Sequence, residues 1–200
     1  LLAGNTACSD LLDKHPEEQY EGSDVLTTVE GLDALLTGCY TLVQSRRYYG
    51  ALMFQIDAAK GLDFYTRRDL ASPTMLRECN YSLSSSSVGE ATYAWETMYS
   101  LIANCNLIVD HIDEVTGNLN EIRRIKGEAM ALRGLAYFDL MRLIAHPPRY
   151  AFPGKDEYDE EKKWGVPIMW TSDMSLNGDK YVIIRETAVD TYDYIIEQFR

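Results

Sequence analysis

Residues 91–145 read ATYAWETMYSLIANCNLIVDHIDEVTGNLNEIRRIKGEAMALRGLAYFDLMRLIA. In both halves of this stretch, apolar residues recur at spacings of three and four, which is the period of one face of an α-helix. Gly117 between the halves suits a helix C-terminus, and Asn118 followed by Glu121 suits the start of the next helix. The stretch therefore predicts two long amphipathic helices joined by a short turn, an antiparallel hairpin.

The two predicted apolar stripes are regular over their whole length. The first consists of Ala91, Trp95, Met98, Ile102, Cys105, Val109 and Ile112, and the second of Ile122, Ile125, Ala129, Leu132, Ala136, Leu140 and Leu143. Pro147-Pro148 ends the second helix near residue 145, because proline cannot continue a helix. Gly127 and Gly134 lie near one another on one face, where we expect a neighbouring helix to approach closely.

Helical patterns also occur on both sides of the hairpin. A helix over 28–46 follows the capping-box sequence at 27–30, and a shorter one over 51–60 ends at Gly61. Residues 147–184 look irregular and include a solvated charged run at 155–163. A last helix begins near Thr187, and its apolar face would consist of Val189, Tyr192, Ile196 and Phe199. The predicted fold class is all-α.

Composition excludes several classes of function. The chain has 200 residues, of which 19 are Lys or Arg and 31 are Asp or Glu, so its net charge is −12. Such a chain is repelled by phosphate backbones, which argues against nucleic acid as a partner. No apolar run reaches the length of a membrane span. Tyrosine is unusually frequent at 14 residues, and tyrosine suits surfaces that stack on a ligand.

Residues 62–90 carry no long periodic pattern, yet they are rich in rings and arginines. A loop of this length within a compact domain is usually functional or disordered. Sugars offer C–H faces to aromatic rings and hydroxyls to planar polar side chains. The residues of suitable type are Asp63, Tyr65, Arg67, Arg68, Asn80 and Tyr81. The alternative is that these side chains hold the loop together through contacts with one another.

No catalytic or metal-binding motif is present in the sequence. The histidines are scattered, and the cysteines lack the spacing of a zinc site. Cys39 and Cys105 fall on apolar stripes and are expected to be buried free thiols. We therefore expect no catalytic residues, no metal and no cofactor.

The N-terminal segment divides at Cys8. Residues 1–7 are small or apolar and end in Ala7 directly before Cys8, as in the remnant of a bacterial lipoprotein signal peptide. Residues 8–26 form an irregular arm. On local sequence alone, lipidation of Cys8 and an ordinary N-terminal arm are both open.

The order of motifs resembles the N-terminal part of SusD/RagB-type proteins, the surface glycan-binding lipoproteins of Bacteroidetes. The most specific match is EAMALRGLAYF at 128–138, which is similar to the family pattern Glu-Ala-x-x-Leu-Arg-Ala-x-x-Tyr-Phe. The other matching segments are CSDLLDKHP at 8–16, GCY at 38–40, WETMYSLIANCN at 95–106, GVPI at 165–168 and RETAVDTY at 185–192.

The resemblance implies a fold, a location and a role. Residues 27–200 would be the helical N-terminal domain of a longer protein, built from tetratricopeptide-like helix pairs and truncated at its C-terminal end. A lipid on Cys8 would anchor the protein in the outer membrane, facing outward. It would bind oligosaccharides without catalysis or cofactor and deliver them to a SusC-like TonB-dependent transporter.

The resemblance also separates motif residues from ligand residues. Those expected to be structural are Trp95, Tyr99, Asn106, Glu128, Arg133 and Tyr137. The loop at 62–88 would contribute to the glycan site by its location, because the family's ligand residues vary with the glycan. Two other classes remain open: a helical-repeat scaffold that binds proteins or peptides, and a secreted hydrolase. A scaffold of this kind would not bind glycans, whereas a hydrolase would release a cleavage product from them.

Overall fold

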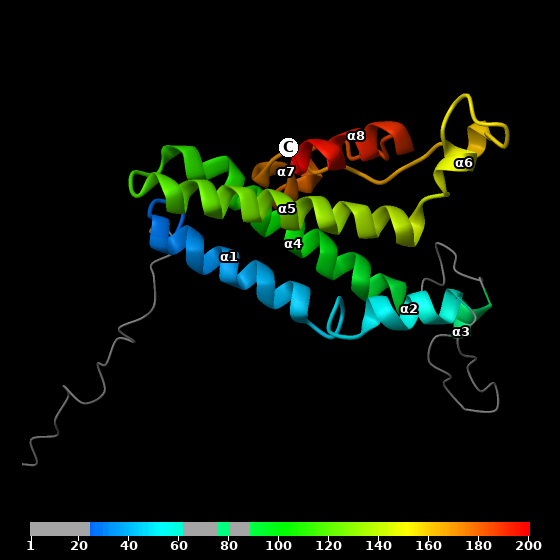
Figure 1. Cartoon of the computed structure of the whole chain (residues 1–200), viewed down its shortest axis with the longest axis horizontal. Coiled ribbons are helices and arrows are strands. Elements are labelled where there is room, and N and C mark those ends of the chain that lie inside the picture. The colour runs from blue at the N-terminus through cyan, green and yellow to red at the C-terminus, as the bar shows by residue number, and fades with distance from the viewer. Residues whose placement is uncertain (1–24, 62–75, 81–88) are drawn as a thin grey trace, which may run out of the picture.

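The computed structural model describes residues 25–61, 76–80 and 89–200. Within these ranges the regular structure is helical, apart from one isolated antiparallel bridge between Trp164 and Thr187. Three long helices form the body: α1 (Val29–Gln44), α4 (Ala91–His111) and α5 (Leu119–Ile144). They lie roughly along the long axis of the molecule (Figure 1). The predicted all-α fold class is confirmed.

The predicted hairpin is formed by α4 and α5. Its second helix begins as expected, because the side chain of Asn118 accepts a hydrogen bond from the Asn120 N–H. The prediction for Gly117 was wrong: α4 ends at His111, and the short 3₁₀ turn η2 (Ile112–Glu114) follows. A Cβ at position 117 would lie 2.6 Å from Cγ2 of Val29. Glycine is therefore favoured there by the close approach of α1, not by a left-handed C-cap.

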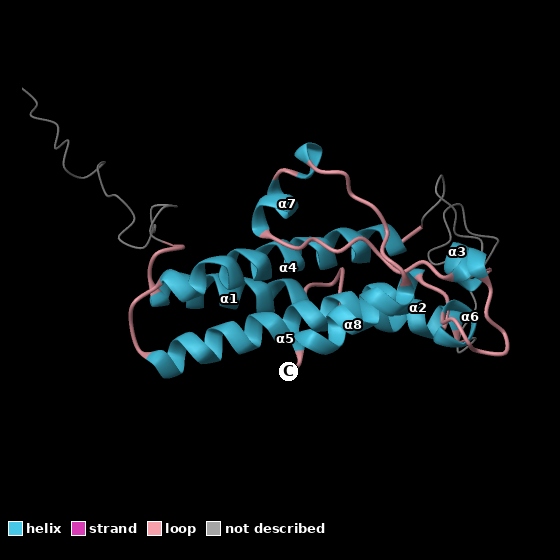
Figure 2. Cartoon of the chain, turned by 90° about the horizontal axis from the view of Figure 1, so that it is seen from above, coloured by secondary structure: helices cyan, strands magenta, loops and turns pink. Residues whose placement is uncertain are grey.

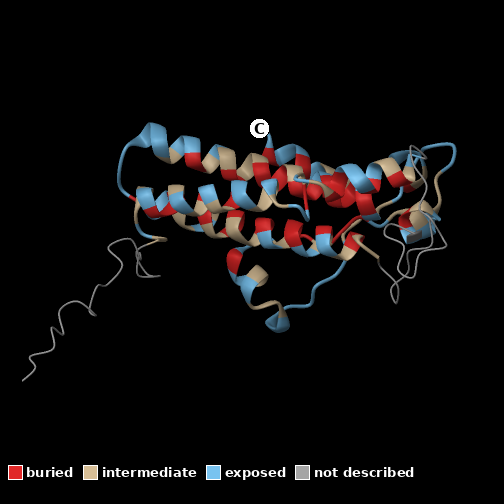
Figure 3. Ribbon diagram, turned by 90° about the horizontal axis from the view of Figure 1, so that it is seen from below, coloured by how far each residue is buried: buried red, intermediate tan, exposed pale blue. Residues whose placement is uncertain are grey.

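The core lies between α1, α4 and α5, where red and tan residues line the facing surfaces (Figure 3). The stripes predicted for the hairpin are buried or half-buried as expected. The fully enclosed core side chains include Leu32, Leu36, Met98, Leu101, Ile102, Ile108, Ile125, Tyr137 and Leu140. Two of the free cysteines, Cys39 of α1 and Cys105 of α4, are also buried there. Their prediction as buried free thiols is confirmed.

The start of α1 differs by one residue from a capping box. The Thr28 hydroxyl accepts a hydrogen bond from the Gly31 N–H, so Thr28 is the N-cap. Glu30 is then the second residue of the helix rather than the third. Helix α2 (Leu52–Lys60) ends at Gly61, as its sequence predicts.

The last helix, α8 (Ala188–Gln198), packs against α5 through a face that the sequence did not indicate. Its buried residues are Ala188, Thr191, Ile195 and Gln198. Ile196 and Phe199 of the predicted face are exposed instead. The polar members of the true face have partners in the fold, so a pattern of apolar residues alone misidentified the face.

Only one of the two glycines in α5 lies at a close contact with another helix. A Cβ on Gly134 would lie 2.9 Å from the side chains of Gln198 and Phe199, so α8 approaches α5 closely at this point. A Cβ on Gly127 would meet nothing within 4 Å, and the expectation for that residue was wrong.

The chain between α5 and α8 is irregular, as predicted, and includes four short helical turns. These are α6 (Pro148–Ala151), η3 (Glu160–Lys162), α7 (Ser172–Leu176) and η4 (Gly178–Lys180). We call residues 164–176 the return segment. It runs back along the hairpin, and α7 packs against α4 (Figure 2). Among the described residues, no helix combines the length and the apolar character that crossing a membrane requires.

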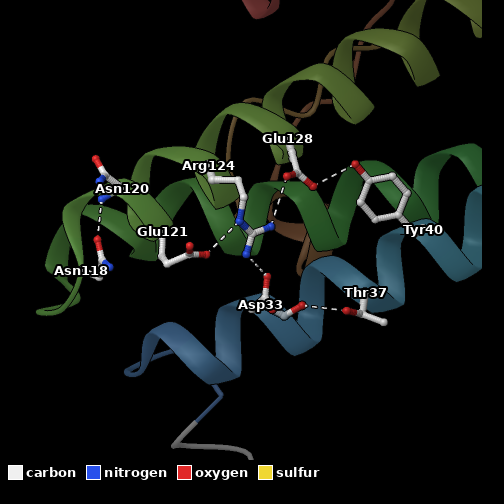
Figure 4. A network of polar contacts seen from close by, with 8 residues as sticks. All are labelled: Asp33, Thr37, Tyr40, Asn118, Asn120, Glu121, Arg124 and Glu128. Carbon is white, nitrogen blue, oxygen red and sulfur yellow. Dashed lines mark hydrogen bonds and ion pairs between the residues drawn. The ribbon is translucent and has the colours of Figure 1, made fainter.

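A polar network on the surface connects α1 to α5 (Figure 4). The Arg124 guanidinium pairs with Asp33 at 2.6 Å and with Glu128 at 3.1 Å. Glu128 also accepts a hydrogen bond of 2.9 Å from the Tyr40 hydroxyl. Since these groups are partly exposed, the network contributes little to stability.

Candidate functional site

The sequence placed the candidate glycan site on the loop at 62–88, and the structure describes the middle of that loop. Asn80 directly follows the short helix α3 (Leu76–Cys79) and is exposed. The other candidates lie outside the described residues: Asp63, Tyr65, Arg67, Arg68 and Tyr81, as does Cys8.

Helix α3 is attached to the N-terminus of α4 by a buried carboxylate. Glu78 is 1% exposed. Its Oε1 accepts hydrogen bonds from the N–H groups of Glu90 at 2.9 Å and Ala91 at 3.3 Å. The N-cap residue of α4, Glu90, provides no side-chain cap of its own. Glu78 therefore takes over the capping role from a different element, and its negative charge is favourable at a helix N-terminus.

Gly89 makes this cap possible. It adopts a φ of +61°, and a Cβ there would lie 2.5 Å from Oε1 of Glu78. A side chain at position 89 would thus be strained and would collide with the capping carboxylate. Neither Gly89 nor Glu78 stands out in the sequence, because the carboxylate that caps α4 comes from a residue 12 positions before Glu90.

The C-terminal end of α2 lies near this junction between α3 and α4. Lys60 Nζ donates a hydrogen bond of 3.1 Å to the carbonyl of Leu143, near the end of α5. Burial lowers the pKa of Lys60, and the negative charges of Asp57 and Glu78 partly offset that effect. We use the term loop base for Lys60, Glu78, Asn80, Gly89 and Glu90. It gathers the ends of α2, α3 and α4 at one end of the molecule (Figure 1).

The motif residue Asn106 has a different role from that of the loop base. This fully buried side chain on α4 binds the return segment: its Nδ2 lies 2.8 Å from the Met169 carbonyl and 3.0 Å from Ser175 Oγ. Its Oδ1 accepts a hydrogen bond of 2.7 Å from Arg133. Asn106 therefore links α4, α5 and the return segment.

Arg133 extends this link to α8. Its Nε and one terminal nitrogen donate to Oε1 of Gln198 at 2.9 and 2.6 Å, and the guanidinium lies 5.9 Å from the centre of the Tyr194 ring. Arg133 is 6% exposed, so these contacts are made away from bulk water. The buried Gln198 belongs to this cluster, which explains its place on the inner face of α8.

Two tyrosines complete the attachment of the return segment. The Tyr99 hydroxyl donates to the carbonyl of Pro167, and the Tyr137 hydroxyl oxygen accepts from the Met169 N–H, each at 2.8 Å. Burial raises the pKa of both phenols. Trp95 packs its ring on Tyr99, at 4.7 Å between centroids. Tyr99 and Tyr137 thus join the hairpin to the return segment, as expected of motif residues with a structural role, and Trp95 packs on Tyr99 within α4.

A second exposed surface was not anticipated from the sequence. Trp164 and Trp170 of the return segment are 42% and 53% exposed. An open hollow of about 450 Å³ is lined by Trp164, Ile184 and Arg185. The Arg185 guanidinium is engaged by the carbonyls of Gly165 and Trp164, at 2.8 and 3.2 Å, so the hollow offers mainly apolar surface. Within residues 25–61, 76–80 and 89–200, no three His, Cys, Asp or Glu side chains gather as metal ligands.

Comparison with protein families gives one match over nearly the whole chain. A SusD-like family model, described as starch-binding associating with outer membrane, matches residues 10–200. Comparison with curated proteins gave no match.

Several solved structures share the fold. A SusD superfamily protein from Bacteroides thetaiotaomicron VPI-5482 matches with a TM-score of 0.65 and 20% identity, over 86% of this chain and 36% of that one. A putative sugar binding protein from Bacteroides vulgatus ATCC 8482 matches with a TM-score of 0.66 and 23% identity, over the same shares. A SusD-like carbohydrate binding protein from the same organism gives 0.64 and 20%, over 86% and 34%. The chain thus spans about a third of the length of these structures.

Proposed function

Because this chain belongs to the SusD-like family, we propose that it is part of a non-catalytic protein that binds oligosaccharides at the outer membrane. The observation that carries the proposal is the loop base, where Glu78 joins the middle of the candidate loop to the N-terminus of α4. This joint gives Asn80 a defined position, and Tyr81 follows it directly in the sequence. The family's motif residues are occupied in joining helices, whereas the loop carries residue types suited to sugars, and we therefore assign the proposed ligand site to the loop.

The residue types on the loop suit recognition of sugars rather than their cleavage. Tyr65 and Tyr81 can stack on the C–H faces of sugar rings, and Arg67 and Arg68 can donate paired hydrogen bonds to neighbouring hydroxyls. Exposed contacts of this kind are individually weak. We expect a dissociation constant roughly in the micromolar to millimolar range.

We further propose the place of the protein in transport. A lipid on Cys8 would hold it at the outer membrane, and a SusC-like TonB-dependent transporter would receive the bound oligosaccharide. Replacing Cys8 by Ser tests the anchor, because the full-length protein should then move from the membrane fraction to the soluble fraction. A Cys8→Ser protein that stays in the membrane would contradict the lipid anchor. Co-purification of the full-length protein with a transporter tests the partnership.

Calorimetric titration tests the binding function. The full-length protein with Cys8 replaced would be titrated with plant, host and microbial glycans. Saturable binding without release of product is expected. Tyr65→Ala and Arg67→Ala should each weaken it about fivefold, the equivalent of about 1 kcal/mol. Arg123→Ala is the matched control, since Arg123 is exposed near the start of α5, away from the loop base.

The alternative is a cell-surface helical scaffold that binds proteins or peptides. One observation favours it: Val182 and Ile184 are 88% and 61% exposed on the chain that precedes α8. Exposed apolar residues of this kind occur at protein interaction sites. Failure of every glycan to bind, together with saturable binding of a peptide ligand, would favour the scaffold. Release of product would instead identify a hydrolase.

A further inference from the structure

Two buried thiols from different helices meet in the core, and neither the sequence motifs nor the proposed function uses them. Cys39 lies on α1 and Cys105 on α4, 66 positions apart in the sequence. Both are fully buried, and their sulfur atoms are 3.9 Å apart. The third described cysteine, Cys79, is only half-buried in α3.

We propose that Cys39 and Cys105 form a disulfide that links α1 to α4 when the chain folds in the presence of a disulfide donor. A disulfide needs two sulfurs that can approach to about 2.0 Å, so the atoms must close a further gap of about 2 Å. The helices that carry them already pack against each other in the core. The sulfurs are thus already in contact. The movement of about 2 Å that would join them is small compared with the distance between the axes of two packed helices, about 8–10 Å.

The chemistry is a thiol–disulfide exchange in two steps. The Cys39 thiolate attacks one sulfur of the donor disulfide, forms a mixed disulfide and expels the first donor thiolate. The Cys105 thiolate then attacks the Cys39 sulfur and expels the second donor thiolate. The protein loses two electrons and two protons, and the donor disulfide is reduced to two thiols.

Since both thiols are enclosed in the finished core, the attack on the donor belongs to folding, before α1 closes on the hairpin. The second attack follows as α1 packs against α4 and brings the two sulfurs together. The reverse order of the two cysteines gives the same product, because the hydrogen bond from the Cys105 thiol to the Cys39 sulfur forms only in the packed core.

Refolding with a defined donor tests the proposal independently of any glycan or membrane. The full-length protein with Cys8→Ser and Cys79→Ser would be refolded from urea with glutathione disulfide and glutathione, denatured again, alkylated and digested with trypsin. We expect a linked product of peptides 15–46 and 78–123, about 2 Da lighter than their sum and separated by dithiothreitol. The same protein with Cys105→Ala should carry one alkyl group and no link.

The cross-link should also raise the melting temperature. Closing a loop of this length in the unfolded chain corresponds to an increase of about 4 °C relative to the reduced protein, for a full-length protein about three times as long as this chain. Two separate alkylated peptides would overturn the proposal and leave the pair as core packing. A persistent mixed disulfide with glutathione would overturn it as well, because the second sulfur would have failed to attack. A linked product with a lower melting temperature would show that the native core does not accept the bond.

Discussion

Replacing Asn106 by Leu should detach the return segment from the hairpin at a large cost in stability. The substitution keeps a similar volume in a fully buried position but removes the amide that bonds Arg133, the Met169 carbonyl and Ser175. Two groups lose their closest partner there: an N–H of the buried Arg133 and the Met169 carbonyl. An unsatisfied buried polar group costs about 1–3 kcal/mol, and more when it is charged, so the total is about 4 kcal/mol.

Urea unfolding of the full-length protein with Cys8 replaced would measure this loss. With a denaturant dependence of about 4 kcal/mol per molar urea for a protein about three times as long as this chain, the unfolding midpoint should fall by about 1 M. Far-UV circular dichroism follows the helices, whereas tryptophan fluorescence also reports on Trp170 of the return segment. We expect the fluorescence to change at lower urea than the dichroism, because the return segment separates first.

Asn104→Leu provides the matched control. It makes the same chemical change two residues earlier, at a half-buried position of α4, and should shift the midpoint by less than about 0.3 M. Arg133→Met alone and combined with Asn106→Leu completes a double-mutant cycle, in which we expect a coupling above about 1 kcal/mol. Equal midpoints for the two Leu variants, or additive effects in the cycle, would refute the argument that Asn106 acts through these contacts.

Four further predictions concern single contacts. Glu78→Ala should lower the free energy of unfolding by about 2 kcal/mol and weaken glycan binding. Glu78→Gln keeps an acceptor oxygen and should restore most of the stability and most of the binding. If the Ala and Gln variants behaved alike in urea unfolding and in calorimetry, the capping role would be contradicted. Gly134→Ala should cost about 1–3 kcal/mol, since its Cβ would lie 2.9 Å from α8 side chains, and Gly127→Ala should be neutral or stabilising in the same unfolding assay. Burial and the neighbouring Asp139 raise the pKa of Tyr49 to about 12, above the usual value near 10, so its contribution to stability is complete below pH 10 and lost as the pH rises towards 12; Tyr49→Phe should flatten the fall of the urea midpoint with pH over that interval. Arg124→Ala should lower the urea midpoint only slightly, and the difference from wild type should shrink in high salt, because the ion pairs of Arg124 are partly exposed.

The sequence allowed the hairpin and its core to be predicted because these depend on local periodicity. The stripe from Ile125 to Leu143 in α5 is buried as the spacing of its residues indicates. The face of α8 could not be found in this way. Its inner side carries Thr191 and Gln198. The Thr191 hydroxyl is satisfied by the Thr187 carbonyl four residues earlier, whereas Gln198 is satisfied by Arg133 of α5. Such pairings arise between elements far apart in the chain, and no local pattern records them.

The candidate site was predicted from residue type, but the contacts that attach its loop to the helices could not be seen in the sequence. Glu78 looks like one more surface acid within a polar loop, and Gly89 looks like an ordinary helix breaker. Their relation appears only when α3 lies against the start of α4, where the carboxylate replaces the side-chain cap that Glu90 does not provide. The exposed Trp164 and Trp170 were missed for a similar reason, since the return segment carries no helical period.

The position of Glu78 also bears on how a ligand site can be built on this loop. Residues 62–88 connect α2 to α4, and α3 divides this connection into segments 62–75 and 81–88. Ordering a segment of chain costs conformational entropy, and α3 meets this cost for its own residues when the protein folds. The cap is formed on folding, so part of the ordering cost of the loop would be met before a sugar bound at the proposed site. Because the cap uses only backbone N–H groups of α4 and one carboxylate, the residues on either side of α3 are free to differ in sequence without loss of this anchor. If the proposed glycan site lies on this loop, its ligand residues could therefore change without loss of the Glu78 anchor.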